Sequence, residues 1–177
     1  MGPKLFQVPV LLGLAYIGIG YVSWTLARLI VRDNGIVTVP SLAALIMVGW
    51  DLSMDPVWSN LGHAWVWHEG GLYFGVPLSN FFGWYLTVYL IYQSFALYLR
   101  RWPTEPRTLP AGFWRLAVIF YGVCAAGNLL VRPPVDLAAG IEWRVSGILM
   151  ASAAVSIMVM GGLAVLAWMR AEDRMSA

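Results

Sequence analysis

Charged residues are scarce in this chain. They make up 11% of its 177 residues, and lysine occurs once, at Lys4. An average soluble domain is about 25% charged and about 45–50% apolar, whereas 60% of these residues are hydrophobic and the mean hydropathy is +0.71. A soluble fold of this length has too little interior to hide that much apolar surface. The lack of charge therefore excludes a soluble domain and predicts that lipid surrounds much of the protein.

Cysteine is almost absent as well. The one cysteine, Cys124, stands within an apolar run, so an intramolecular disulfide is excluded and packing as a small residue is its expected role. The basic residues are few and sit in short clusters between apolar stretches. A nucleic-acid partner is excluded because it would need a contiguous basic face.

Long apolar runs are what the sequence does have. Crossing the hydrocarbon core as a helix takes about 20 residues, and five stretches are long enough: about 8–31, 36–54, 78–99, 111–131 and 141–169. The second is predicted to end at Asp55-Pro56, since a residue before proline is disfavoured in the helical region. The third is predicted to begin at Pro77-Leu78-Ser79-Asn80, where a polar side chain can cap it. The predicted fold is an all-α integral membrane protein, a single domain over residues 1–177 with about five transmembrane helices.

The positions of the basic residues predict the orientation. One side of the membrane receives Arg28, Arg32, Arg100, Arg101, Arg107, Arg115, Arg170 and Arg174, and the other receives Lys4, Arg132 and Arg144. The arginine-rich side is expected to be cytoplasmic, with the N-terminus outside and the C-terminus inside a bacterial cytoplasmic (inner) membrane. The connection 55–77 is then non-cytoplasmic.

Two aspartates stand out in the stretch from Gly49 to Trp84, which contains no lysine or arginine. Asp51 and Asp55 are four residues apart and so share a helical face. A carboxylate within a membrane span is costly and marks a functional site by default. Two carboxyl groups in a low-dielectric site cannot both ionise easily, so one is expected to hold a proton and the pair can act as acid and base. The alternative is that Asp51 pairs with an arginine such as Arg132 while Asp55 only shapes the turn.

Histidines in the same stretch allow a weaker metal or pigment hypothesis, based on His63, His68 and Glu69. A spacing of five residues does not put both imidazoles on one helical face, and it does not match the HExxH pattern. Solvated or hydrogen-bonded loop histidines are therefore expected, and no metal site is predicted.

Aromatic side chains are concentrated here too. The tryptophans mark the membrane interface in one interpretation; in the other, some of them line a pocket and stabilise a developing cation with their ring faces. They are Trp50, Trp58, Trp65, Trp67 and Trp84. On the third helix, Tyr85, Tyr89 and Tyr92 form a stripe that either borders a channel for a long flat ligand or packs against another helix.

Three ordered motifs follow one another in this stretch: Trp50-Asp51-Leu52-Ser53-Met54-Asp55-Pro56, then Trp65 and Trp67, then Tyr73-Phe74-Gly75-Val76-Pro77-Leu78-Ser79-Asn80-Phe81-Phe82-Gly83-Trp84. Together they resemble the carotenoid-biosynthesis membrane protein family, whose pattern is W-D-L-x-x-D-P, W-x-W and G-x-P-x-x-N-[FY]-x-G-W. Its named members are carotenoid 1,2-hydratases, such as bisanhydrobacterioruberin hydratase and γ-carotene hydratase. The resemblance covers about Gly49 to Gln93. Family members are usually longer, with further helices upstream, so a shortened member is expected.

The resemblance implies an enzyme that adds water to the terminal double bond of an acyclic (ψ) carotenoid of the lycopene or γ-carotene type, without a cofactor or metal. It implies Asp51 as the acid and Asp55 as its partner. Substrate-binding roles fall to Trp50, Trp65, Trp67, Asn80, Tyr85 and Tyr89, with Asn80 either orienting the water or capping the third helix.

Two other functions stay open. A non-catalytic carotenoid-binding or structural subunit could sit with partner subunits in a larger membrane complex, for example a photosynthetic one. A transporter or channel subunit fits less well, because the polar residues gather at one membrane face instead of crossing the bilayer.

Overall fold

The protein folds into five long helices. The computed structural model describes residues 4–5, 8–31, 35–103, 109–132 and 142–176. The helices are α1 (Val10–Val31), α2 (Thr38–Asn60), α3 (Leu78–Arg101), α4 (Ala111–Leu129) and a continuous last helix made of α5 (Glu142–Ala154), the π-helical η1 (Val155–Gly161) and α6 (Gly162–Ser176). A short antiparallel pair, β1 (Lys4–Leu5) and β2 (Val8–Pro9), precedes α1. The predicted all-helical fold with five helices is confirmed.

Three of these helices are long and apolar enough to cross a membrane, over Gly13–Val31, Gly112–Leu129 and Glu142–Asp173. The other two, α2 and α3, reach the required length of about 20 residues but are more polar. That they too cross the membrane stays a prediction.

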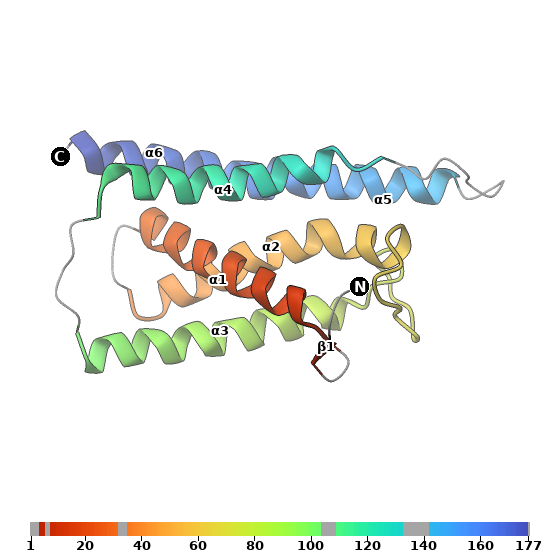
Figure 1. The fold of residues 1–177 in the computed structure, drawn as a ribbon, viewed down its shortest axis with the longest axis horizontal. Helices are drawn as coiled ribbons and strands as arrows, with labels where there is room; N and C mark the ends of the chain where they lie inside the picture. The colour runs from red at the N-terminus through yellow and green to blue at the C-terminus, as the bar shows by residue number, and fades with distance from the viewer. Residues whose placement is uncertain (1–3, 6–7, 32–34, 104–108, 133–141, 177) are drawn as a thin grey trace.

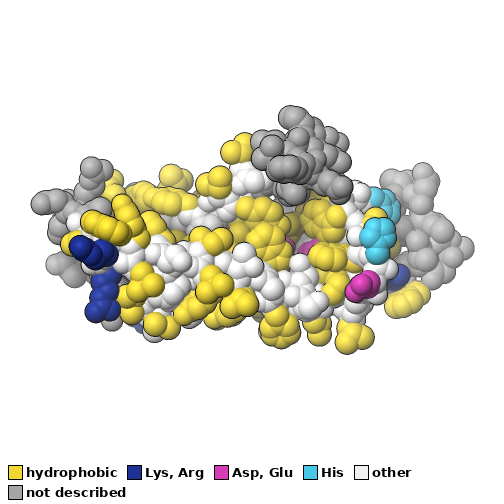
Figure 2. All heavy atoms as spheres, turned by 90° about the horizontal axis from the view of Figure 1, so that it is seen from below, with side chains coloured by type: hydrophobic (Ala, Val, Ile, Leu, Met, Phe, Trp, Pro, Cys, Tyr) yellow, Lys and Arg dark blue, Asp and Glu magenta, His cyan; other side chains and the backbone are white. Residues whose placement is uncertain are grey.

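One end of the bundle collects the basic helix ends. Figure 1 places the C-terminal ends of α1, α3 and α6 together with the N-terminal end of α4, and Figure 2 shows Lys and Arg side chains gathered at that end. The predicted arginine-rich side is therefore one physical end of the described structure. Arg32 and Arg107, which also counted toward it, lie outside the described residues.

Helix α2 lies in the middle of the bundle. It packs against α3, α1, α5 and η1 (Figure 1), and most of its side chains from Val39 to Val57 are buried. Ala43, Ala44 and Ile46 are completely buried. Because protein instead of lipid surrounds α2, this helix can carry aspartate and serine side chains that a lipid-facing helix could not.

Helix α2 does not stop at Asp55-Pro56, so that prediction was wrong. It continues to Asn60 with Pro56 inside it. A proline in a helix removes the N–H that would bond the carbonyl four residues earlier, which here is the carbonyl of Leu52. The Tyr73 hydroxyl donates to that oxygen at 3.1 Å, and this bond replaces the missing amide. Burial raises the pKa of Tyr73 above its ordinary value, so the hydroxyl stays a donor.

The connection from Leu61 to Pro77 is held by a two-residue turn. Tyr73 and Val76 form a bridge, and the central residues Phe74 and Gly75 both have positive φ, at 53° and 89°. This is the geometry of a type I′ turn, in which a non-glycine residue is strained. The Phe74 ring packs closely on Gly147 of α5, where an added Cβ would lie 3.1 Å from the ring. That contact helps to hold the strained residue.

A cluster of buried polar side chains surrounds Ser53, on the face of α2 that turns toward α4 and η1. Ser53 contacts Ser156 of η1 at 2.6 Å between hydroxyl oxygens, and the Asn128 amide of α4 donates to Ser53 at 2.6 Å. Ser152 lies at 3.4 Å from Ser53. Polar bonds of this kind hold helices together in an apolar surrounding. The cluster links α2 to α4 at the place where the last helix widens into its π-helical turn.

We predict that Tyr73→Phe lowers the free energy of unfolding by about 1 kcal/mol, because the Leu52 carbonyl loses its donor. In a Pro56→Ala background the loss should shrink toward zero, since residue 56 then supplies an N–H. Unfolding of the four proteins of this double-mutant cycle in detergent measures the difference. Tyr98→Phe, at an exposed tyrosine of α3, is the control. An equal loss in both backgrounds would contradict the proposed partnership.

Candidate active site

Asp51 and Asp55 lie one turn apart on α2 and are both buried, with 5% and 2% of their surface exposed. The Asn80 amide nitrogen, in the first turn of α3, donates to Asp55 Oδ2 at 2.9 Å and to Asp51 Oδ2 at 3.3 Å. One amide group thus bridges the two carboxyl groups. No basic side chain forms an ion pair with Asp51 in the part of the chain that the structure describes, which includes Arg132.

Asn80 does not cap α3, although the sequence left that role open. The N-cap is Pro77, which makes no side-chain capping bond. The Asn80 side chain turns toward α2 because the two carboxyl groups lie there. Its amide nitrogen donates to both carboxyl groups, and the role of orienting water stays a prediction.

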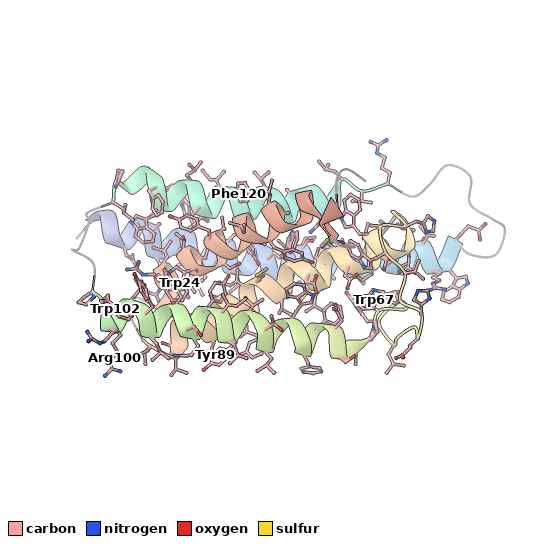
Figure 3. The ribbon with its side chains drawn as sticks, turned by 60° about the horizontal axis from the view of Figure 1, so that its bottom comes forward. Trp24, Trp67, Tyr89, Arg100, Trp102 and Phe120 are labelled. Atoms are coloured by element: carbon pink, nitrogen blue, oxygen red, sulfur yellow. The ribbon has the colours of Figure 1, made fainter. Side chains whose placement is uncertain are left out.

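Two tryptophans of the connection also bind Asp55. The Trp65 indole N–H donates to Asp55 Oδ1 at 2.7 Å, and that of Trp67 donates to the same oxygen at 3.4 Å. The W-x-W spacing suits this arrangement, since residues two apart in an extended segment point to the same side. Figure 3 shows Trp67 at the end of the bundle where α3 begins. The connection therefore folds back over the end of α2 and supplies donors to its buried carboxylate.

Asn60 ties this connection to two helices. Its amide donates to the carbonyl oxygens of Pro56 at 2.8 Å and Phe74 at 2.9 Å. Its own oxygen accepts a bond of 3.0 Å from Arg144 of α5. The last turn of α2, the turn at Phe74 and the start of α5 are held at one point.

A narrow crevice between α1, α2 and α3 reaches Asp51. Its lining is apolar and aromatic: Tyr16, Met47, Val48, Trp50, Trp84 and Val88 surround the Asp51 side chain. The Tyr16 ring stacks on Trp84 with centroids 4.8 Å apart and meets Trp50 edge-on at 5.9 Å. Figure 2 shows acidic side chains at the bottom of a hollow whose rim is hydrophobic. The crevice therefore brings aromatic ring faces close to a buried carboxyl group.

The structure gathers most of the site residues expected from the sequence, but not all. Asp51, Asp55, Trp65, Trp67 and Asn80 are joined by hydrogen bonds, as described above, and Trp50 lines the crevice. Tyr85 and Tyr89 stack on each other with centroids 6.1 Å apart, farther along α3. Figure 3 shows Tyr89 well away from Trp67. These two tyrosines make no hydrogen bond to the carboxylates among the described contacts.

The histidines of the connection are exposed side chains. His63, His68 and Glu69 all face outward. Over the described residues, no group of three or more histidine, cysteine or acidic side chains is close enough together to hold a metal ion.

Three residues that line or support the site were given no role from the sequence: Tyr16, Tyr73 and Asn60. Tyr16 is one of two tyrosines in an apolar helix, with Tyr21, and nothing in its neighbourhood marks it. Tyr73 could have been found by asking which donor serves the carbonyl that Pro56 leaves free. Asn60 lies at a helix end, where a polar residue carries no particular signal.

Comparison with known proteins identifies the family to which the chain belongs. The family model described as "Carotenoid biosynthesis protein" matches residues 1–143. The chain belongs to this family. The match includes α1 to α4 and every residue of the carboxylate site, and it leaves out nearly all of the last helix. No curated protein and no solved structure matches the chain. Membership shows a role in carotenoid biosynthesis without naming the reaction.

We predict that Trp65→Phe lowers the free energy of unfolding by about 1.5–3 kcal/mol, because Asp55 loses a hydrogen bond to a charged group. The phenyl ring keeps most of the apolar contact. In an Asp55→Asn background the loss should fall to about 1 kcal/mol, the usual value for a neutral pair. Detergent-based unfolding of the four proteins provides the measurement.

The matched control is Trp58→Phe, because Trp58 is 51% exposed and should change stability by less than about 0.5 kcal/mol. If Trp65→Phe is as mild as this control, the indole bond does not stabilise Asp55.

Proposed function

We propose that this chain hydrates the terminal double bond of an acyclic (ψ) carotenoid end group, on substrates of the lycopene or γ-carotene type. One observation carries the proposal: in a member of the carotenoid biosynthesis family, Asn80 bridges two buried carboxyl groups, and one of them, Asp51, lines a narrow aromatic crevice. Adding water to an alkene requires an acid, a base and walls that exclude bulk solvent. This site offers all three.

The hydrogen bonds assign the two carboxyl groups different roles. Trp65, Trp67 and Asn80 all donate to Asp55, and N–H donors favour the ionised form of a carboxyl group. Asp51 receives the longer bond from Asn80 and lines the crevice. Since two neighbouring carboxylates repel each other, Asp51 is the one that holds the proton. Asp51 is thus the acid, and Asp55 is the partner that is ionised before the reaction begins.

The reaction then proceeds without a redox change. The Asp51 proton bonds to the less substituted carbon of the terminal double bond, which uses the π electrons and leaves a tertiary cation on the neighbouring carbon. The ring faces of Tyr16, Trp50 and Trp84 stabilise that cation. A water oxygen bonds to the cation, Asp55 accepts the proton that the water loses, and transfer of this proton to Asp51 restores the pair. The product contains one more water than the substrate.

Asn80 acts as a positioning residue in this scheme. Its amide holds both carboxyl groups at a fixed separation, which favours proton transfer between them. The role differs from that of orienting water, which the resemblance had left open. Trp65 and Trp67 likewise hold Asp55 in place instead of lining the substrate path.

The proposal also includes a topology. All five helices cross a bacterial cytoplasmic membrane, the end with Arg28, Arg100 and Arg101 faces the cytoplasm, and the carboxylate site lies toward the opposite face. The positive-inside rule supports this orientation. A polyene dissolved in the bilayer would reach the crevice sideways, between α1 and α3.

A second candidate is a carotenoid-binding or structural subunit without catalysis. One observation favours it: α3 packs against the rest of the bundle mainly through α2, and its outer face exposes Phe82, Leu86 and Leu90. Such a face suits another membrane subunit as well as lipid. The two candidates differ in whether the bound polyene changes chemically.

We predict that expression of the chain in a lycopene-accumulating bacterium yields a carotenoid heavier by one water, and that Asp51→Asn abolishes it. The amide of the variant cannot donate a proton to an alkene. Chromatography and mass spectrometry of the membranes and of the purified protein measure both pigments.

Glu69→Gln provides the matched control, because it neutralises an exposed carboxylate of the same segment and should leave the product yield unchanged. Full activity of a folded Asp51→Asn protein would remove Asp51 from its role. Unchanged lycopene that co-purifies with the unsubstituted protein would favour the binding subunit.

A further inference from the structure

A second, larger cavity lies farther along the seam where α1 and α3 meet above α2. Its volume is about 330 Å³, and residues of α1, α3 and the start of α4 line it, among them Gly20, Trp24, Tyr92, Phe95, Phe113 and Trp114. Figure 3 shows Trp24 between α1 and α3, toward the arginine-rich end of the bundle. The crevice at Asp51 and this cavity therefore follow one another along the same pair of helices.

The Tyr92 side chain connects the lining of the cavity with that of the crevice. The Tyr92 hydroxyl crosses the seam and donates to the Gly20 carbonyl at 2.7 Å, and its oxygen lies 3.8 Å from the Met47 sulfur. Tyr92 lines the cavity, whereas Met47 lines the crevice. A ligand that occupies both spaces would lie against the Tyr92 ring.

The walls of the cavity suit a flat hydrocarbon. The Trp24 ring lies 5.6 Å from Tyr92 and 5.2 Å from Phe95, measured between centroids, and Phe113 lies 5.3 Å from Trp114. Aromatic rings bury large flat surfaces and contact one another, or a conjugated ligand, through stacked and edge-on geometry. Thr25 and Arg28 of α1 also line the cavity, and the aromatic remainder of its wall favours a conjugated chain.

The length of the seam suits a long chain. From Trp84 at the crevice to Phe95 in the cavity, α3 rises by about 16 Å, and to Leu99 by about 22 Å, at 1.5 Å per residue. That is most of the hydrocarbon thickness of a bilayer, which is about 30 Å. A shorter isoprenoid with its end group at Asp51 would not extend into the cavity.

We propose that this cavity binds the distal part of the same polyene whose end group lies at Asp51, so that the seam selects substrates by chain length. The inference rests on the proposed function for the identity of the ligand. It adds a binding subsite, formed by Gly20, Trp24, Tyr92 and Phe95, that is separate from the carboxylates.

Two glycines of α1 provide a matched test. At Gly20 an added Cβ would lie 3.4 Å from the Tyr92 hydroxyl, whereas at Gly18 nothing lies within 4 Å. Gly20→Leu therefore fills the cavity, and Gly18→Leu adds the same side chain away from it. Both variants of the full chain are offered lycopene and a truncated acyclic isoprenoid with the same end group.

We expect the ratio of lycopene conversion to truncated-substrate conversion to fall about tenfold in Gly20→Leu relative to Gly18→Leu. Gly20→Ala, which adds less volume, should give an intermediate ratio and serves if the leucine variant does not fold. An unchanged ratio overturns the inference. So does a phospholipid that co-purifies with the protein and is lost in Gly20→Leu while the ratio stays the same.

Failure of the proposed function would be recognised separately, because the unsubstituted chain would then convert neither substrate. In that case the ratio of polyene absorbance to protein absorbance, in purified protein from the lycopene host, tests the cavity. Loss of polyene in Gly20→Leu with retention in Gly18→Leu supports the subsite. Equal retention in both, or no polyene with the unsubstituted chain, overturns it.

Discussion

A carboxylate inside an apolar bundle must receive hydrogen bonds from the protein, because lipid and hydrocarbon side chains offer none. Here two such carboxyl groups lie on one face of α2, and the surrounding structure supplies their donors. The connection after α2 folds back so that Trp65 and Trp67 reach Asp55, and α3 begins where Asn80 can bridge both acids. The fold at this end of the bundle therefore follows from the need to solvate Asp51 and Asp55.

The same constraint explains the central place of α2. A helix with two buried acids on one face and Ser53 on the other can face lipid on neither, so other helices must cover both. On the second face, Asn128 and Ser156 bond Ser53, and the last helix adopts a π-helical turn there. Wider π-helical turns often occur at functional positions. The two polar faces together fix the rotation of α2 about its own axis, and with it the direction in which the acids point.

Local features of the fold could be predicted from the sequence, and non-local ones could not. Helix positions follow from runs of apolar residues, which each segment carries by itself, so the presence of five helices could be predicted, although α2 and the last helix extend six and seven residues beyond the predicted ends 54 and 169. The stop expected at Pro56 was wrong because a backbone preference yields when a distant hydroxyl, that of Tyr73, replaces the lost donor. On α3, the stripe with Tyr85 and Tyr89 was predicted to bind the substrate. The face of α3 that turns toward the acids is the neighbouring one, with Asn80 and Trp84. Which face turns inward depends on the partner helix, and a single sequence does not contain that information.

The family match ends where the last helix begins, and this boundary separates the residues of the site from those that support it. The matched residues 1–143 contain the acids, all their donors and the whole α1–α3 seam, whereas the last helix contributes support from behind α2. Its contacts with α2 and the connection include Arg144 with Asn60, Gly147 with Phe74, and the serines with Ser53. Each of these acts on an element that holds the site instead of on the carboxylates. A helix in that position can vary in sequence as long as it keeps α2 and the connection in place, because the chemistry depends on the geometry of the two acids and not on the residues that support it.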